Sequence, residues 1–166
     1  MEAYFSYVKD GVSPTLKEVT SKSEELIRGD VLKVAKSKDG LEFEDLIPNP
    51  DVIKTLFETA QTLEKNLKLQ YGEKSMFFPE FKIQGKLNQV IEDKGYILRG
   101  CIDLLVVGND GRLHILDYKT SPKDYNSLEY SNVKRYTYSH QLGTYNRILG
   151  QYGLDHASST MKIVPL

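Results

Sequence analysis

Two apolar segments, residues 97–107 and 112–120, flank a short polar turn in the second half of the chain. The turn at 108–111 reads Gly-Asn-Asp-Gly, and these residue types supply the positive φ angles that tight hairpins require. Both segments are apolar on both of their alternating faces, which is typical of central strands that are covered on both sides. We therefore predict a buried β-hairpin.

The pattern around this hairpin predicts helices before and after it. Apolar residues at helical spacing, with Ser13-Pro14 as a helix start, predict helices over 15–20, from 21 or 23 to 36, over 50–71 and over 137–149. Further strands are predicted over 77–83, 86–91 and 161–166. This order predicts one α/β domain over residues 1–166, with a helical part at 13–72 and a mixed central β-sheet, flanked by helices, at 77–166.

Charged residues interrupt both hairpin strands: Asp103 lies in the first, and Asp117 and Lys119 lie in the second. Asp117 and Lys119 share a face about 7 Å apart, and folding the hairpin brings Asp103 opposite Leu116 or Asp117. Carboxylates this close repel each other unless a proton or cation lies between them, and a hard divalent ion with oxygen ligands fits. The alternative is a buried Asp–Lys ion pair, with the second aspartate at a strand end.

Net charge, cysteine content and apolar run length each exclude some classes of protein. The formal net charge is −1, which does not fit a protein that coats nucleic acid, so any basic surface must be local. The single cysteine, Cys101, lies in a predicted core strand, which fits a reducing, cytoplasmic or otherwise intracellular setting and excludes a four-cysteine iron–sulfur cluster. Since the sequence shows no apolar run of membrane-spanning length and no targeting signal, we expect no membrane association.

A polar stretch after the hairpin combines basic and aromatic residues. Lys123, Lys134 and Arg135 are interleaved with tyrosines between 121 and 138. Cations that pair with phosphates and rings that stack on bases suit single-stranded nucleic acid. The alternative is an ordinary loop whose tyrosines pack locally.

These residues together resemble a known signature. Asp103, thirteen residues and then Asp117-Tyr118-Lys119 resemble the motif of the PD-(D/E)XK nuclease superfamily. The longer match, GCIDLL followed by DGRLHILDYKTS and QLGTY, is similar to its RecB-like and Cas4-like exonuclease branch. The resemblance implies a restriction-endonuclease-like αβββαβ core and a Mg²⁺- or Mn²⁺-dependent deoxyribonuclease.

The resemblance also implies roles for individual residues. Asp103, Asp117 and the backbone carbonyl of Tyr118 would bind Mg²⁺ or Mn²⁺, and Lys119 would position the attacking water. Glu80 matches the acidic residue of the preceding strand in this family and would support a second ion; its alternative is a solvent-facing edge-strand glutamate.

The helix over 137–149 carries the last motif. Gln141 and Tyr145 match the family's Q-x-x-x-Y, which contacts the DNA strand or positions the lysine, although a packing role is an equal alternative for Gln141 and the favoured one for Tyr145. The implied substrate is single-stranded DNA ends in repair, recombination or replication, with a helicase or other recombination protein as a possible partner.

One departure from the family pattern concerns the expected histidine ligand. The family places a histidine four residues after an Arg-Gly pair, whereas this chain has Lys33 at that distance from Arg28-Gly29. This departure keeps open a second hypothesis, a catalytically inactive module that binds nucleic acid or protein. A third is an endonuclease of the restriction or junction-resolving type.

Overall fold

The computed structural model describes residues 1–34, 49–91, 94–119, 133–154 and 160–165, with the backbone alone for 30–34, 87–91, 94–96, 119, 133–135 and 160–165. The chain divides into two compact units, residues 1–67 and 68–166, which are described separately. Within the described residues, no helix is both long and apolar enough to cross a membrane.

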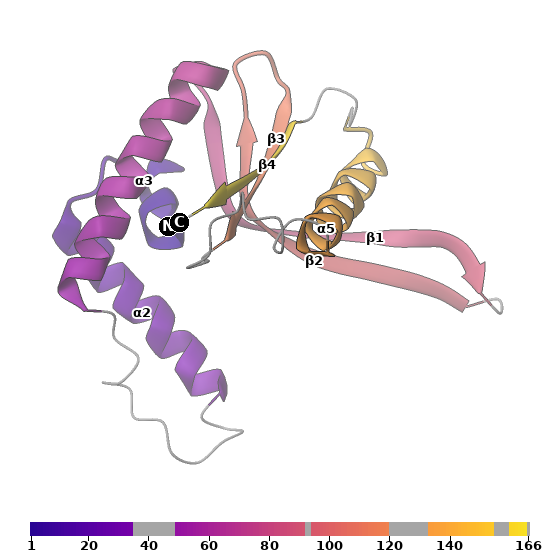
Figure 1. The fold of residues 1–166 in the computed structure, drawn as a ribbon, viewed down its shortest axis with the longest axis horizontal. Helices are drawn as coiled ribbons and strands as arrows, with labels where there is room; N and C mark the ends of the chain where they lie inside the picture. Colours follow the sequence, from indigo (N-terminus) through magenta and orange to yellow (C-terminus); the bar gives the residue numbers. More distant parts are fainter. Residues whose placement is uncertain (35–48, 92–93, 120–132, 155–159, 166) are drawn as a thin grey trace. The chain divides into compact units, whose positions relative to one another are not determined.

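The first unit is helical and holds α1 (Glu2–Val8), α2 (Leu16–Val34) and most of α3 (Pro50–Tyr71), as Figure 1 shows. The pattern does not predict α1, yet this helix supplies the buried side chains of Tyr4 and Phe5. The Tyr4 hydroxyl donates a hydrogen bond to Glu64 of α3 (2.5 Å), and its ring meets the Phe57 ring edge-on.

Helix α2 is one continuous helix, so the predicted break near residue 21 is wrong. The helix begins after Thr15 rather than at Ser13-Pro14. Thr15 and Glu18 form a capping box, in which the Thr15 N–H donates to the Glu18 carboxylate (2.7 Å) and the Glu18 N–H donates to the Thr15 hydroxyl (3.3 Å). The Ser23 hydroxyl bonds the Val19 carbonyl inside the helix and therefore does not cap a new one.

The second unit contains a four-stranded sheet in the order β1-β2-β3-β4. Its strands are β1 (Met76–Ile91), β2 (Lys94–Val107), β3 (Leu113–Lys119) and β4 (Thr160–Pro165). The first three pair antiparallel and β4 runs parallel to β3, a connection that requires a crossover and contains α5 (Val133–Gly150). The predicted mixed sheet with an αβββαβ order is confirmed (Figure 1).

Strand β1 is longer than predicted, because 77–83 and 86–91 belong to one strand. The polar residues at 84 and 86 indicated a break that does not exist. Backbone groups of Lys86 on this strand instead bond the side chain of Gln151: the Lys86 N–H donates to Gln151 Oε1 (2.9 Å), and Gln151 Nε2 donates to the Lys86 carbonyl (2.7 Å). The Gln151 side chain thereby bonds the free edge of β1, where a further strand would otherwise pair.

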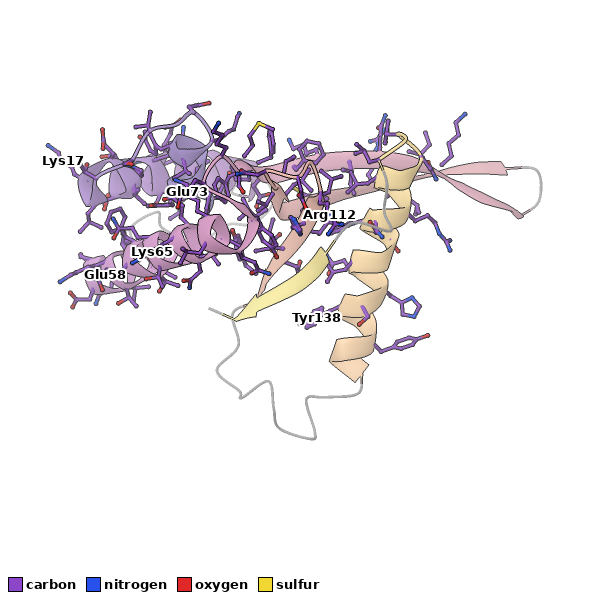
Figure 2. All side chains as sticks on the ribbon, turned by 90° about the horizontal axis from the view of Figure 1, so that it is seen from above. Lys17, Glu58, Lys65, Glu73, Arg112 and Tyr138 are labelled. Atoms are coloured by element: carbon purple, nitrogen blue, oxygen red, sulfur yellow. The ribbon has the colours of Figure 1, made fainter. Side chains whose placement is uncertain are left out.

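The predicted hairpin of β2 and β3 is confirmed. Its turn lies at 108–111, where Gly111 has a φ of +76°. Asp110 accepts a hydrogen bond from the backbone N–H of Arg112 (3.0 Å), a residue whose side chain is labelled in Figure 2. Side chains on both faces of the two strands are buried, among them Leu104, Leu105, Ile115 and Leu116.

Helix α5 packs on one face of this sheet. Leu142, Ile148 and Leu149 of α5 join a core cluster with residues of β1, β2 and β3 that include Ile83, Ile102, Leu105 and Ile115. Two glycines let the helix approach closely: a Cβ at Gly85 would meet Ile148 at 3.0 Å, and one at Gly100 would overlap the Tyr145 ring. The helix is thus fixed against the strand that carries Asp103.

Candidate active site

The sheet forks where its charged residues lie. Backbone pairing between β2 and β3 ends at Leu104 and Leu116. Beyond this point β2 continues to pair with β1, and β3 continues to pair with β4 as far as Lys119. The sheet therefore separates into a β1–β2 arm and a β3–β4 arm, and Asp103 and Asp117 are the first residues inside the fork.

The side chain of Asp103 closes the ladder at the fork. Its Oδ2 accepts a hydrogen bond from the backbone N–H of Tyr118 at 2.7 Å. In a continuous ladder a backbone carbonyl of β2 would accept from this part of β3. Because β2 has turned away, the carboxylate satisfies a donor that would be costly to leave unpaired. Asp103 is thus held beside the backbone of the Asp117-Tyr118-Lys119 segment.

Asp117 is the residue of β3 that follows the last pair between β2 and β3. The last observed pair is Leu104 with Leu116, and extending this register by one residue sets Asp103 opposite Asp117, which favours Asp117 over Leu116 as the facing residue. The Asp117 residue is 2% exposed. Two carboxylates that face each other, one of them deeply buried, repel unless a positive charge or a proton lies between them.

Glu80 enters the same region from β1 with an unusual backbone conformation. Pro79 pairs with Leu104 and Phe81 with Ile102, so Glu80 faces Asp103 in the register. Its φ is +49°, in the left-handed region where non-glycine residues are uncommon and often functional. Its carboxylate accepts a hydrogen bond from the Cys101 thiol at 3.0 Å.

Two neutral groups, the Cys101 thiol and the Tyr118 phenol, lie near these carboxylates. Burial, then the hydrogen bond to Glu80 and the nearby negative charges of Glu80 and Asp103, raise the pKa of the Cys101 thiol to about 12. Burial, followed by the charges of Asp103 and Glu80, also raises the pKa of the Tyr118 phenol. Sequence reasoning missed Cys101 as a neighbour of the site, although its position two residues before Asp103 places both on one strand face.

The oxygen atoms at the fork suit a hard divalent cation. Asp103 and Asp117 offer carboxylates. The Tyr118 carbonyl points toward Asp103, because the N–H and C=O of one strand residue lie on the same side of the strand and the N–H bonds Asp103. Among the described residues no three histidine, cysteine, aspartate or glutamate side chains form a metal-binding group. The fitting donor set is therefore two carboxylates and one backbone carbonyl.

The side chains of several predicted site residues lie outside the described part of the structure. Lys119 lies two residues after Asp117 on β3, so backbone alternation sets both on one face, but its side chain lies outside the described part. The same holds for the side chains of Lys33, Lys134 and Arg135, and Lys123 lies outside the described residues altogether.

Gln141 and Tyr145 are joined on α5. Gln141 Nε2 donates to the Tyr145 hydroxyl at 2.9 Å, and the Tyr145 ring lies against Gly100 of β2. The packing role that the sequence favoured for Tyr145 agrees with this contact. The contact also links two motif segments, GCID and Q-x-x-x-Y, within one packed layer.

His114 lies away from the fork, as its position in the alternation predicts. It is 5% exposed and stacks on Tyr71 at the end of α3, with ring centroids 3.6 Å apart and 17° between the planes. Burial lowers the pKa of its imidazole. His114 therefore belongs to the packing of the hairpin rather than to the carboxylate cluster.

Comparison with known proteins gives one family. The model of the PD-(D/E)XK nuclease superfamily matches residues 15–162, which include every candidate residue from Glu80 to Tyr145. A search among curated proteins found no match. The membership implies a nuclease that acts on nucleic acid, and members of this group generally use divalent metal ions. With most of its length matched and its fold in agreement, the chain belongs to the PD-(D/E)XK nuclease superfamily.

Proposed function

We propose that this chain is a Mg²⁺- or Mn²⁺-dependent deoxyribonuclease of the RecB-like branch that digests single-stranded DNA from its ends. The observation that carries the proposal is the fork. Within it, one hydrogen bond fixes Asp103 beside Tyr118, the register sets Asp117 opposite, and the Tyr118 carbonyl points to the same side. Oxygen donors of this kind, at the end of a sheet ladder, suit hydrolysis of a phosphodiester.

The residues of the fork have separate roles in this mechanism. Asp103, Asp117 and the Tyr118 carbonyl would hold the ion. When bound, a divalent ion supplies positive charge that acidifies water and neutralises the phosphate. The buried Asp117 carboxylate keeps this charge in a region of low dielectric constant, where electrostatic interactions are stronger. Glu80 would support a second ion from the β1 side.

Lys119 orients the attacking water and donates to a phosphoryl oxygen, which offsets the charge that develops on the phosphorus centre. The water oxygen forms a bond to phosphorus as the bond to the 3′-oxygen breaks. The attacking water releases a proton to solvent and the leaving 3′-oxygen takes one up from solvent, so the products are a 3′-hydroxyl and a 5′-phosphate.

Other parts of the chain guide the strand to this centre. Gln141 on α5 contacts the DNA or positions Lys119, and the basic side chains at 123, 134 and 135 bind phosphates. A role in repair, recombination or replication, with a helicase or another recombination protein as partner, follows from the branch that the motifs resemble.

Cleavage of an end-labelled single-stranded DNA with Mg²⁺ or Mn²⁺ tests the proposal. Lys119→Ala and Asp117→Ala should each lower the rate at least about 100-fold, the range for loss of one electrostatic group at a reacting centre. Lys74→Ala, at an exposed position in the turn before β1, is the matched control and should cleave like the wild type. A closed circular single strand should resist digestion, because an exonuclease needs an end; cleavage of the circle would indicate an endonuclease.

An inactive binding module is the second candidate, and Lys33 at the position of the expected histidine favours it. This alternative predicts that the folded wild type binds DNA but cleaves neither DNA nor RNA with either metal. Circular dichroism of each variant separates a loss of activity from a loss of fold.

A further inference from the structure

A pocket of about 640 Å³ lies between the β1–β2 arm and the end of α5. Residues 81–84 of β1, Arg99 and Gly100 of β2, and Leu149, Tyr152 and Leu154 at the end of α5 and beyond line it. None of the residues proposed for catalysis lines this pocket, so its chemistry is not explained by the cleavage reaction.

The interior of the pocket is mostly apolar. Ile83 and Leu149 are buried and Phe81 is half-buried, whereas Tyr152 and Leu154 are 62% and 38% exposed. The Tyr152 hydroxyl donates to the backbone carbonyl of Gln84 at 2.6 Å, which holds the ring in place at the edge of β1. A fixed, exposed aromatic ring beside an apolar hollow offers a surface on which a flat ring can stack.

Two cationic residues on the strands of this arm border the pocket, and strand alternation sets their side chains on the face opposite Ile83. Lys82 and Arg99 are exposed, and within the described part of the chain neither has an ion-pair partner. A ligand that complements this lining combines a flat, largely apolar ring with an adjacent negative charge. A nucleotide unit of a nucleic acid strand has both features.

The two strands of the pocket lead directly to the fork. Lys82 lies two residues from Glu80 on β1, and Arg99 lies four residues before Asp103 on β2, a distance of about 13 Å along the strand. At roughly 3.4 Å for each stacked nucleotide, a strand that follows this arm covers that distance in about four nucleotides, or in fewer when it is extended.

We infer that this pocket binds one base of the single-stranded substrate, a few nucleotides away from the bond to be cleaved, by stacking on Tyr152. Arg99 and Lys82, on the opposite face of the same arm, bind phosphates of the strand as it passes around the edge of β1. The inference rests on the proposed nuclease function and adds a base-stacking pocket to it. Because a ring stacks on any base, the pocket accepts all four bases and fixes the position of the strand rather than its sequence.

A binding experiment with an abasic scan tests the pocket. The protein carries Lys119→Ala so that the DNA stays intact, and binding of a labelled thymidine oligonucleotide is measured by fluorescence anisotropy with Mg²⁺. In a series of oligonucleotides one abasic site moves along the strand by one nucleotide at a time. We expect one position at which loss of the base weakens binding about tenfold, while the other positions have little effect.

Variants connect that position to the pocket. Tyr152→Ala should weaken binding of the intact oligonucleotide about tenfold and abolish the dependence on the abasic position. Tyr152→Phe retains the ring but loses the hydrogen bond to Gln84, so it should preserve the dependence on the abasic position and weaken binding less than Tyr152→Ala does. Arg112→Ala, which removes an exposed arginine outside the pocket, is the matched control for Arg99→Ala and should bind like the parent. Leu154→Glu, a change at an exposed position that brings a carboxylate to the lining, should weaken binding without disturbing the Tyr152 hydrogen bond.

The outcomes separate this inference from the function on which it rests. An oligonucleotide that binds tightly with a flat abasic profile overturns the pocket and leaves the nuclease proposal intact. A position-dependent profile that persists in a folded Tyr152→Ala variant also overturns the pocket, because the stacking base then lies elsewhere. Failure of the protein to bind any single-stranded DNA overturns the proposed function and the pocket together.

Discussion

The carboxylate of Asp103 accepts a hydrogen bond from the backbone N–H of Tyr118, and this bond lies one residue beyond the last backbone pair of β2 and β3. Asp103 therefore helps to end the ladder in addition to its proposed role as a metal ligand. A buried N–H that loses its acceptor costs about 1–3 kcal/mol. The fold alone gives a reason for an acceptor at this position, and the proposed chemistry adds a reason for a negative charge.

These two roles predict different effects for two substitutions of Asp103. Asp103→Asn keeps an oxygen acceptor for Tyr118, so its free energy of unfolding should stay within about 1 kcal/mol of the wild type while cleavage is lost. Asp103→Ala should lose cleavage and in addition about 1–3 kcal/mol of stability. Urea denaturation followed by circular dichroism, beside a cleavage assay, measures both quantities. An active Asp103→Asn enzyme would show that the charge is not needed.

The left-handed backbone of Glu80 predicts a substitution that preserves or raises stability while it lowers activity. A left-handed residue other than glycine is strained by roughly 1–2 kcal/mol, and glycine relieves this strain at a smaller entropic cost. Glu80→Gly should therefore be as stable as the wild type, or more stable by up to about 1 kcal/mol, and should cleave more slowly. Glu80→Val removes the same carboxylate but cannot adopt this φ easily, so it should lose about 1–3 kcal/mol.

Thermal unfolding of the two Glu80 variants gives the comparison. If valine is tolerated as well as glycine, the left-handed conformation is not retained in solution. If both variants cleave at the wild-type rate, Glu80 has no role in the reaction, and its strained backbone requires another explanation.

The hairpin could be predicted from the sequence, whereas the fork could not. Two nearly continuous apolar segments around a Gly-Asn-Asp-Gly turn specify two paired strands through local rules. The fork depends on β1 and β4, which pair with the outer sides of the hairpin and continue after β2 and β3 have separated. Which residue of β3 faces Asp103 also depends on whether the ladder contains a bulge, and the sequence does not determine this.

The predicted breaks in β1 and α2 were wrong for a similar reason. Polar residues near Gly85 indicated a break in β1, but the strand pairs with β2 without interruption from Phe81 to Leu87. Gln151, more than sixty residues later, bonds the backbone of Lys86 at the other edge of the strand. In α2 the serines near residue 21 indicated a new start, although the Ser23 hydroxyl can bond inside the existing helix. Tertiary partners and local alternatives to capping lie outside what periodicity detects.

Burial of His114 predicts a pH dependence of stability. Its pKa is lowered in the folded chain, so below the usual histidine pKa of about 6.5 the unfolded chain takes up a proton that the folded chain resists. The free energy of unfolding should therefore fall as the pH drops from 7 to 5, with at most about 1.4 kcal/mol per pH unit from this residue. His114→Phe keeps a ring on Tyr71 but cannot titrate, and urea titrations across this range should show a shallower slope. Equal slopes would contradict the assignment.

The contact between Gly100 and Tyr145 predicts that a single added methyl group at this position is poorly tolerated. A Cβ at Gly100 would overlap the Tyr145 ring, so Gly100→Ala must displace α5 or the ring and should cost about 1–3 kcal/mol. In a Tyr145→Ala background the same substitution should cost much less, because the clash is gone. The difference between the two costs is the interaction energy of a double-mutant cycle, and we expect it to exceed about 1 kcal/mol.

Gly143 on the same helix provides the control for this cycle. A Cβ there meets nothing within 4 Å, so Gly143→Ala should be neutral or stabilise the helix by up to about 1 kcal/mol. Gly100→Ala should also slow cleavage more than Gly143→Ala does, because Gly100 lies on the strand that carries Asp103 and Tyr145 bonds Gln141. If Gly100→Ala costs the same with and without the tyrosine ring, α5 does not pack on β2 through this contact, and the link between the GCID and Q-x-x-x-Y segments is wrong.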